Sequence, residues 1–219
     1  IILDQLGEKL SPDQVICEPD RRNTAPCILM ASLKIKKLNP DAKIVICPSD
    51  HIIIDEKLFT EDMELALEHA DEKKLITFGI KPDFPATGFG YVAVDKDQKD
   101  CQLKKVTAFT EKPDKAIAQR YIDDQNYFWN SGIFVWSATA VLKGFKTHAP
   151  LLYDLFHKGF DLLNTSSEGA FIAQYYPLAE NISVDYALME KSEHIFLIPA
   201  HFDWDDLGSW KSIYDRQPK

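Results

Sequence analysis

The sequence has no hydrophobic run long enough to cross a membrane and no surplus of positive charge. A bilayer-spanning helix needs roughly 20 consecutive apolar residues, and no stretch of these 219 residues approaches that length. We therefore expect no membrane partner. Asp and Glu outnumber Lys and Arg by 34 to 25, which gives a formal net charge of −9. Because nucleic-acid surfaces depend on clustered Lys and Arg, this charge balance argues against a nucleic-acid partner.

Cysteine is also sparse, with four residues and no C-x-x-C spacing, so the usual signature of a zinc or redox pair is missing. Cys17 and Cys47 fall in apolar runs, and we expect them to be reduced thiols in the core. Reduced thiols and the lack of a charged-then-apolar leader predict a cytoplasmic protein. The first methionine is Met30, and residues 1–6 resemble the tail of an amphipathic helix. We therefore expect the beginning of the fold to be absent.

Strand and helix patterns alternate along the chain. Short, uniformly apolar strands between amphipathic helices are typical of a parallel sheet covered on both faces, whereas the polar strand connections of the second half favour a mixed sheet. The sequence predicts an α/β fold with a mixed, largely parallel sheet flanked by helices. We expect strands at 15–17, 44–47, 75–80, 91–94, 106–109, 129–136 and 195–198, and helices at 24–38, 59–73, 114–123, 137–143, 151–163 and 208–216.

Asp50 comes directly after the apolar strand predicted at 44–47. Ligands of open α/β sheets bind beyond the carboxyl ends of the strands, which makes Asp50 a candidate metal ligand. A carboxylate suits Mg²⁺, because proteins commonly hold this ion through one or two carboxylates together with substrate phosphates. The alternative is that Asp50 caps the next helix or turn.

Polar or glycine-rich segments adjoin three further strands. Gly90 precedes the strand at 91–94, where glycine indicates either a close backbone approach to a ligand or a bulge. Glu111 can accept hydrogen bonds from sugar hydroxyls and Lys112 offers a point charge to a phosphate, although a solvated ion pair would explain both. Asn130 and Ser131 suit hydroxyl recognition, with an ordinary Asn-Ser-Gly turn as the alternative.

Arg22 and Asn23 adjoin the start of the helix predicted at 24–38, where backbone N–H groups can face a phosphate or a purine. Simple N-capping by Asn23 or Thr24 is the alternative. Two acidic residues lie near the end of the chain. Asp185 lies in the first turn of a short helix, where an acidic residue also stabilises the helix, and Asp206 lies at the start of the final helix.

Seven motifs occur in order along nearly the whole chain. They are Glu-Pro-x-x-Arg-Asn-Thr-Ala-Pro at 18–26, Pro-Ser-Asp-His at 48–51, Thr-Gly-Phe-Gly-Tyr at 87–91, Glu-Lys-Pro at 111–113, Trp-Asn-Ser-Gly at 129–132, Val-Asp-Tyr-Ala-Leu-Met-Glu-Lys at 184–191 and Trp-Asp-Asp-Leu-Gly-Ser-Trp at 204–210. Each motif is weak alone, but together they resemble the sugar-phosphate nucleotidyltransferase family. The Arg-Asn-Thr-Ala-Pro segment resembles its guanylyl branch, the mannose-1-phosphate guanylyltransferases.

The resemblance implies a Rossmann-like catalytic domain over 1–219 that joins mannose 1-phosphate and GTP into GDP-mannose and pyrophosphate with Mg²⁺. It implies catalytic roles for Asp50 and Lys112, and metal ligation by Asp50 with a second carboxylate from Asp185 or Asp206. It leaves homo-oligomerisation open. The substrate-binding residues that it implies are Arg22, Asn23, Gly90, Tyr91, Glu111, Asn130 and Ser131.

One family feature is missing from the sequence. The family normally begins with a strand and a glycine-rich loop that cradles the triphosphate, and no Gly-Gly pair or comparable loop occurs here. We therefore expect a partial catalytic domain that lacks this loop. Two alternatives follow: a nucleotidyltransferase for another hexose 1-phosphate or nucleotide, and a noncatalytic subunit that binds sugar nucleotides.

Overall fold

The computed structural model describes the chain apart from residues 1–3, 6, 8, 99–100, 209 and 216–219. Its helices are α2 (Thr24–Leu38), α3 (Glu56–His69), α4 (Lys115–Asp124), α5 (Ala138–His148), α6 (Pro150–His157), α7 (Glu168–Tyr175) and α8 (Trp210–Asp215). Its strands are β1 (Lys43–Ile46), β2 (Leu75–Ile80), β3 (Tyr91–Val94), β4 (Lys104–Thr110), β5 (Tyr127–Ser137) and β6 (Ile195–Pro199). Short 3₁₀ turns lie at Pro12–Gln14, Lys96–Gln98, Phe160–Leu162 and Tyr176–Leu178, and a π-helical turn, η5, spans Asp185–Met189.

Local sequence explains where most of these elements begin. Asn23 caps α2 by accepting a hydrogen bond from the Thr24 amide, and Asp55 caps α3 by accepting one from the Leu58 amide. Asp114 and Ser137 cap α4 and α5 in the same way. Such caps satisfy amides that have no partner inside the helix. The bounds given above confirm most of the predicted helices and strands, with shifted ends.

The segment 15–17 is an exception, because it was predicted to be a strand and is not one. No strand of the described chain pairs with it, and an isolated apolar run cannot satisfy its backbone groups as a strand. The predicted helix at 1–6 lies largely outside the described residues. Residues 209 and 216, which belong to the helix predicted at 208–216, also lie outside them, as do residues 217–219.

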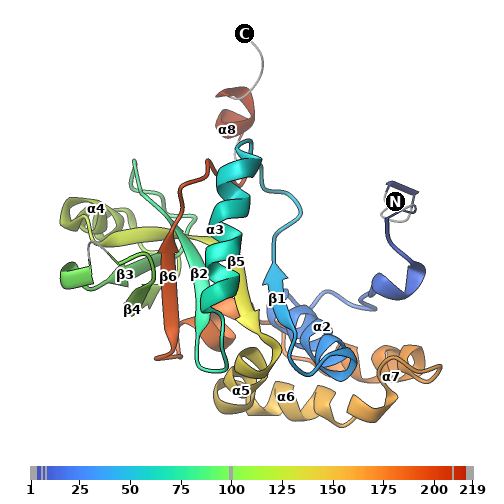
Figure 1. Cartoon of the computed structure of the whole chain (residues 1–219). Coiled ribbons are helices and arrows are strands. Elements are labelled where there is room, and N and C mark those ends of the chain that lie inside the picture. Colours follow the sequence, from blue (N-terminus) through green and yellow to red (C-terminus); the bar gives the residue numbers. More distant parts are fainter. Residues whose placement is uncertain (1–3, 6, 8, 99–100, 209, 216–219) are drawn as a thin grey trace.

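The six strands form one mixed sheet in the order β1-β5-β2-β6-β4-β3, with β5 also paired to β3 (Figure 1). The mixed α/β architecture is confirmed. The expectation of a largely parallel sheet is wrong, because β2 and β6 pair in parallel while the other pairings are antiparallel. The long strand β5 lies between β1 and β2 and runs against both. Strands β2 and β3 are buried at almost every position, so their apolar runs reflect cover on both faces of the sheet rather than the direction of the neighbouring strands.

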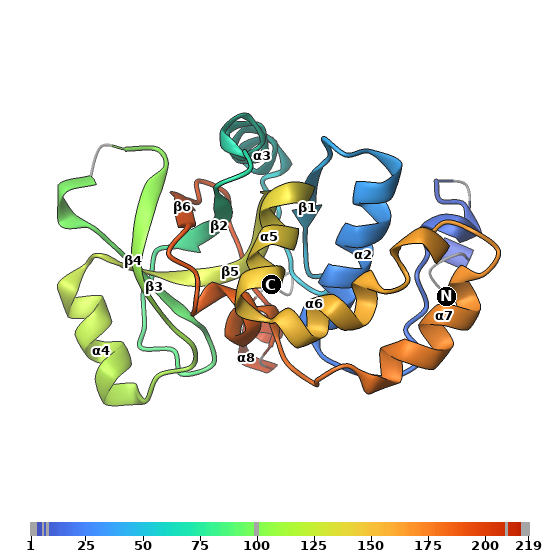
Figure 2. The same cartoon turned by 90° about the horizontal axis from the view of Figure 1, so that it is seen from below.

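Helices cover both faces of the sheet. Helices α2, α5, α6 and α7 pack on one face, where their apolar side chains form one buried cluster with Phe134 and Trp136 of β5. Helix α3 packs on the other face against Ile133 and Val135 of the same strand. Helix α4 lies beside β3 at one end of the molecule, whereas α2 and α7 lie at the other (Figure 2). No helix of the described residues is long and apolar enough to span a membrane.

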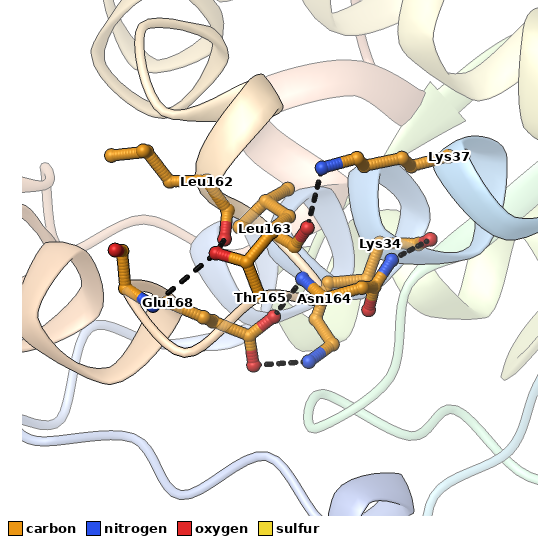
Figure 3. Close-up of polar contacts among 8 residues, drawn as sticks. Lys34, Lys37, Leu162, Leu163, Asn164, Thr165 and Glu168 are labelled. Atoms are coloured by element: carbon orange, nitrogen blue, oxygen red, sulfur yellow. Dashed lines mark hydrogen bonds and ion pairs between the residues drawn. The ribbon is translucent and has the colours of Figure 1, made fainter.

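The segment 162–168 ties α7 to α2 (Figure 3). Lys34, which is 8% exposed, forms an ion pair with Glu168, and the other carboxylate oxygen of Glu168 accepts a hydrogen bond from the Asn164 amide. Lys37 donates to the carbonyl oxygens of Asp161 and Leu163. These contacts hold α2 in place, and the first turn of α2 borders the site described below.

Candidate functional site

A cleft of about 390 Å³ lies at the end of β1, beside the part of β5 that pairs with β1 there. Residues from the start of α2, from the loops that follow β1 and β6, and from η5 line the cleft. These lining residues are Thr24, Cys27, Ile28, Ile46, Cys47, Pro48, His51, Gly88, Phe89, Gly90, Glu111, Asn130, Ser131, Gly132, Phe134, Val184, Asp185, Trp204 and Asp206. Six of the predicted site residues are among them: Gly90, Glu111, Asn130, Ser131, Asp185 and Asp206.

Asn130 is held in one orientation by its neighbours. The Thr77 hydroxyl lies 2.8 Å from Asn130 Oδ1, so this oxygen is the acceptor. The Asn130 amide nitrogen then donates to Asp185 Oδ1 at 3.0 Å. This chain of contacts joins β2, β5 and η5, and it assigns the donor and acceptor atoms of the amide. It leaves a carboxylate and an amide side by side on the wall of the cleft.

Glu111 lies close to this pair, and its side chain is 8% exposed. Its carboxylate forms an ion pair with Lys112 at 3.0 Å. Lys112 has a left-handed backbone conformation, with φ of 47°, and its amide donates to the Phe89 carbonyl at 3.2 Å. The Lys112 side chain is 59% exposed, and Lys112 itself is not among the residues that line the cleft, whereas its partner Glu111 is.

Burial and charge perturb the acid–base chemistry of this cluster. Burial, together with the negative charge of Glu111, raises the pKa of Asp185 to about 6. The hydrogen bond to Glu111 raises the pKa of Lys112, which keeps that group charged at neutral pH. The cluster therefore combines two carboxyl groups, one amide and one cation, a set that can bind several hydroxyls and a phosphate.

His51 lines the cleft together with Asp206. Burial lowers the pKa of His51, while the negative charges of Asp50, Asp206 and Asp205 act in the opposite direction. Trp204 Nε1 donates to His51 Nδ1 at 3.1 Å, which assigns the ring proton to Nε2. His51 Nε2 lies 4.0 Å from Asp50 Oδ1. Asp50 itself does not line the cleft, and its side chain is 84% exposed.

The first turn of α2 has few amides left for a phosphate. Asn23 occupies the Thr24 amide, the Ala25 amide donates to the Ile182 carbonyl, and Pro26 has no N–H. The capping alternative is therefore confirmed for Asn23. Arg22 forms an ion pair with Asp20 at 2.7 Å, and neither Arg22 nor Asn23 lines the cleft.

Two other predicted positions have clear structural contacts. Tyr91 is fully buried, donates its hydroxyl to the Ala86 carbonyl at 2.9 Å and does not line the cleft. Ser131 lines the cleft, and its hydroxyl oxygen accepts a hydrogen bond from the Ile133 amide at 3.2 Å.

The cysteines differ from the expectation of core thiols. All four are free, but Cys17 and Cys47 are exposed rather than buried. Their apolar neighbours misled the prediction, because neither segment is covered on both sides. Burial and the charge of Glu18 raise the pKa of Cys27, which lines the cleft, to about 11. Its thiol is therefore protonated at neutral pH and is not a nucleophile.

Sequence reasoning missed Thr77, His51, Trp204 and Phe89 as parts of the site. Thr77 offered a signal, because it is a hydroxyl residue inside an otherwise apolar strand. His51 and Trp204 belong to two of the seven motifs, but the motifs alone gave them no role. Phe89 packs edge-on against both Trp129 and Trp204, so it links the two motifs that carry these residues.

Comparisons with known proteins agree with this architecture. A family model described as nucleotidyl transferase matches residues 4–219. The Xanthan biosynthesis protein XanB of Xanthomonas campestris pv. campestris (strain B100) is 36% identical over 97% of this chain and 45% of its own length. The mannose-1-phosphate guanylyltransferase of Escherichia coli K12 is 35% identical over 98% of this chain and 46% of its own length. The chain thus spans less than half the length of these relatives.

Solved structures share the fold. A crystal structure described as mannose-1-phosphate geranyltransferase from Thermus thermophilus superposes with a TM-score of 0.81 at 24% identity, covering 99% of this chain and 68% of the other. One described as mannose-6-phosphate isomerase from Helicobacter pylori gives 0.76 at 26% identity, covering 93% and 78%.

Proposed function

The chain belongs to the nucleotidyl transferase family, and on that premise we propose that it transfers GMP from GTP to mannose 1-phosphate, forming GDP-mannose and pyrophosphate. The observation that carries the proposal is the cluster of Glu111, Asn130 and Asp185 on the wall of the cleft, with Lys112 paired to Glu111 beside it. Its acceptors and donors suit the hydroxyls of a hexose ring, and its cation suits the phosphate on that ring. Relatives named mannose-1-phosphate guanylyltransferase support the choice of sugar and nucleotide.

The reaction needs no covalent enzyme intermediate. A phosphate oxygen of mannose 1-phosphate attacks the α-phosphorus of GTP, and the bond from that phosphorus to the β-phosphate bridging oxygen breaks. Pyrophosphate leaves with the bonding electrons. Positioning and charge neutralisation provide most of the catalysis of such transfers. Glu111, Asn130, Ser131 and Asp185 would orient the sugar, and Lys112 would hold its phosphate toward the nucleotide.

We assign Mg²⁺ to Asp50 and Asp206, and we place Asp185 on the sugar side. Asp50 Oδ1 lies 4.0 Å from His51 Nε2 and Asp206 lines the same cleft as His51, whereas Asp185 is hydrogen-bonded to Asn130. No group of three or more His, Cys, Asp or Glu side chains in the described part of the chain could hold a metal ion. A pair of carboxylates fits Mg²⁺, which completes its shell with water and phosphate oxygens. When bound, the ion would neutralise charge on the phosphates.

The guanine nucleotide would lie toward the start of α2, near Arg22 and Asn23. Since the Thr24 and Ala25 amides already have acceptors, side chains rather than helix amides would make these contacts. The buried Arg22 Nε has no hydrogen-bond partner, which supports a ligand contact at this guanidinium.

The test measures Mg²⁺-dependent pyrophosphate release with GTP, UTP, dTTP or ATP and mannose 1-phosphate, alongside calorimetric binding of mannose 1-phosphate and GDP-mannose. We expect GTP to be preferred. Lys112→Met should weaken mannose 1-phosphate binding by about 10- to 100-fold, since a hydrogen bond to a charged group is lost. Lys96→Met is the control, because Lys96 also pairs with a carboxylate, but that carboxylate, Asp124, does not line the cleft as Glu111 does.

Three results would contradict the proposal in different ways. Preference for another nucleotide or hexose phosphate would keep the enzyme class and change the substrate. Binding of GDP-mannose without pyrophosphate release would favour the noncatalytic sugar-nucleotide subunit. If the Lys112 and Lys96 substitutions weakened mannose 1-phosphate binding equally, the cleft would not be the site that binds the sugar phosphate.

A further inference from the structure

The two loops that carry Asp50 and Asp206 are linked to each other. We call residues 47–55 the β1 loop and residues 200–208 the β6 loop. Both follow the carboxyl ends of their strands and lie toward the start of α3 (Figure 1). Ile52 and Asp205 form an antiparallel bridge between them: the Ile52 amide donates to the Asp205 carbonyl at 2.9 Å, and the Asp205 amide donates back at 3.2 Å. The Trp204–His51 hydrogen bond is a second link.

Asp203 provides a third link through its side chain. Its Oδ1 accepts hydrogen bonds from the amides of Ile54 and Asp55, each at 2.8 Å. These amides directly precede α3, whose first turn is capped by the Asp55 carboxylate. One carboxylate of the β6 loop therefore holds the end of the β1 loop and the beginning of a helix.

A link to α3 secures the other end of the β6 loop. Asp62, on α3 and 3% exposed, accepts hydrogen bonds from the His201 amide at 2.7 Å and has its other oxygen 2.8 Å from His201 Nδ1. The β6 loop is thus held at residues 201, 203, 204 and 205, all of them before Asp206. These contacts are independent of any ligand.

Such links matter because Asp50 and Asp206 are like charges. Two carboxylates repel each other, so two free loops would move apart whenever no cation lay between them. A cation would then have to draw the loops together, at the expense of its own affinity. Residues that fix the position of metal ligands from outside the coordination shell typically contribute about 10- to 100-fold to affinity or activity.

We propose that Asp203 is a positioning residue, which holds the β1 and β6 loops at the separation that lets Asp50 and Asp206 bind one divalent cation. The proposal rests on the metal assignment of the proposed function. Asp203 acts through two backbone amides, so its role depends on an oxygen acceptor at Oδ1 and not on its charge. Asp203→Asn retains this acceptor, whereas Asp203→Ala removes it.

The test measures Mn²⁺ binding to the ligand-free chain by electron paramagnetic resonance, and amide hydrogen exchange at Ile54 and Asp55 without metal. We expect Asp203→Ala to weaken Mn²⁺ binding by about 10- to 100-fold and to speed exchange of both amides. Asp203→Asn should remain close to the unaltered chain in both measurements. Asp71→Ala is the control, because the Asp71 carboxylate also accepts a backbone amide, from Lys73 at 2.7 Å, in the turn before β2.

The outcomes separate this inference from the proposed function. If the unaltered chain binds Mn²⁺ and Asp203→Ala binds it equally well, the positioning role is wrong and the metal site stands. If Asp203→Asn weakens binding as much as Asp203→Ala, charge rather than the hydrogen bonds is responsible, and the role is again wrong. If Asp71→Ala has the same effect, the loss reflects general destabilisation, which also contradicts the role. Absence of Mn²⁺ binding by the unaltered chain would overturn both the metal assignment and this role.

Discussion

At the scale of single residues, the environment of Asp185 distinguishes it from the other acidic residues of the cleft. Its carboxyl group is buried, it accepts a hydrogen bond from Asn130, and it adjoins the negative charge of Glu111. Asp50, in contrast, is largely exposed. Desolvation disfavours the ionised form, so the folded protein holds a proton on Asp185 more tightly than the unfolded chain does. Ionisation of Asp185 therefore lowers the free energy of unfolding.

Asp185→Asn should make the protein more stable at neutral pH. The pKa of Asp185 rises from 3.8 to about 6 on folding. The protonated carboxyl group therefore contributes its full stabilisation of the folded state below pH 3.8, and this stabilisation is lost as the pH rises through 6. The substituted amide cannot ionise and can still accept from Asn130. The gain in unfolding free energy should grow between about pH 4.5 and 7.5, to at most about 3 kcal/mol. Urea denaturation across this range measures it, with the exposed Asp41→Asn as control. A gain that does not vary with pH would contradict the explanation.

At the scale of elements, the close approach of β3 and β4 shapes the part of the cleft that we propose binds the sugar. Tyr91 of β3 pairs with Thr110 of β4, which places Gly90 beside Glu111. A Cβ atom at Gly90 would lie 2.5 Å from Glu111 Oε2, closer than real contacts allow. The absence of a side chain at Gly90 thus leaves room for the Glu111 carboxylate across the sheet. Gly88, two residues earlier, has open space around it.

Gly90→Ala should displace the Glu111 carboxylate and so weaken sugar binding. Overpacking of this kind costs about 1–3 kcal/mol, and part of that cost is relieved by movement of the flexible Glu111 side chain. We therefore expect a small loss of thermal stability and a clear loss of mannose 1-phosphate affinity, both measured on the purified chain. Gly169→Ala, at a glycine with open space around it in α7 and outside the cleft, should leave this affinity unchanged. Equal affinities for the two variants would show that Glu111 does not contact the sugar.

At the scale of the whole molecule, β5 connects the parts of the fold. Its second half pairs with β1 and β2, and its first half pairs with β3, which packs beside α4. Side chains of alternate β5 residues enter the cores on the two faces of the sheet. Loss of any of the strands paired with β5 would therefore expose one side of β5. One domain over 1–219 stays a prediction, which the unfolding of the chain can test.

Unfolding should accordingly be a single cooperative transition. Far-ultraviolet circular dichroism reports on the helices, and tryptophan fluorescence reports on the four tryptophans, of which Trp129 and Trp136 lie in β5. The two signals should give coincident curves in urea, as expected for two-state behaviour. Two separate transitions would show that the β3–β4–α4 region unfolds independently, and would contradict the single-domain prediction.

The sequence alone determined the local features of this protein. Helix caps such as Asn23 and Asp114 act on amides within three residues, and apolar periodicity depends on neighbours along the chain, so both are visible in the sequence. The motifs indicated the family for the same reason, because each is a short run of residues that can be recognised without the fold. They also singled out Glu111, Asn130 and Asp185, which the structure brings together.

The tertiary structure decided what depends on contacts far apart in the chain. Strand direction was one such property: β5 entered between β1 and β2, and the segment 15–17 found no partner strand among the described residues. The separate surroundings of Asp185 and Asp206 were another, because Asn130 lies 55 positions before Asp185 and the Asp203 contacts reach back 148 and 149 positions. A carboxylate's pKa and partners depend on burial and on neighbouring charge, which only the folded chain establishes.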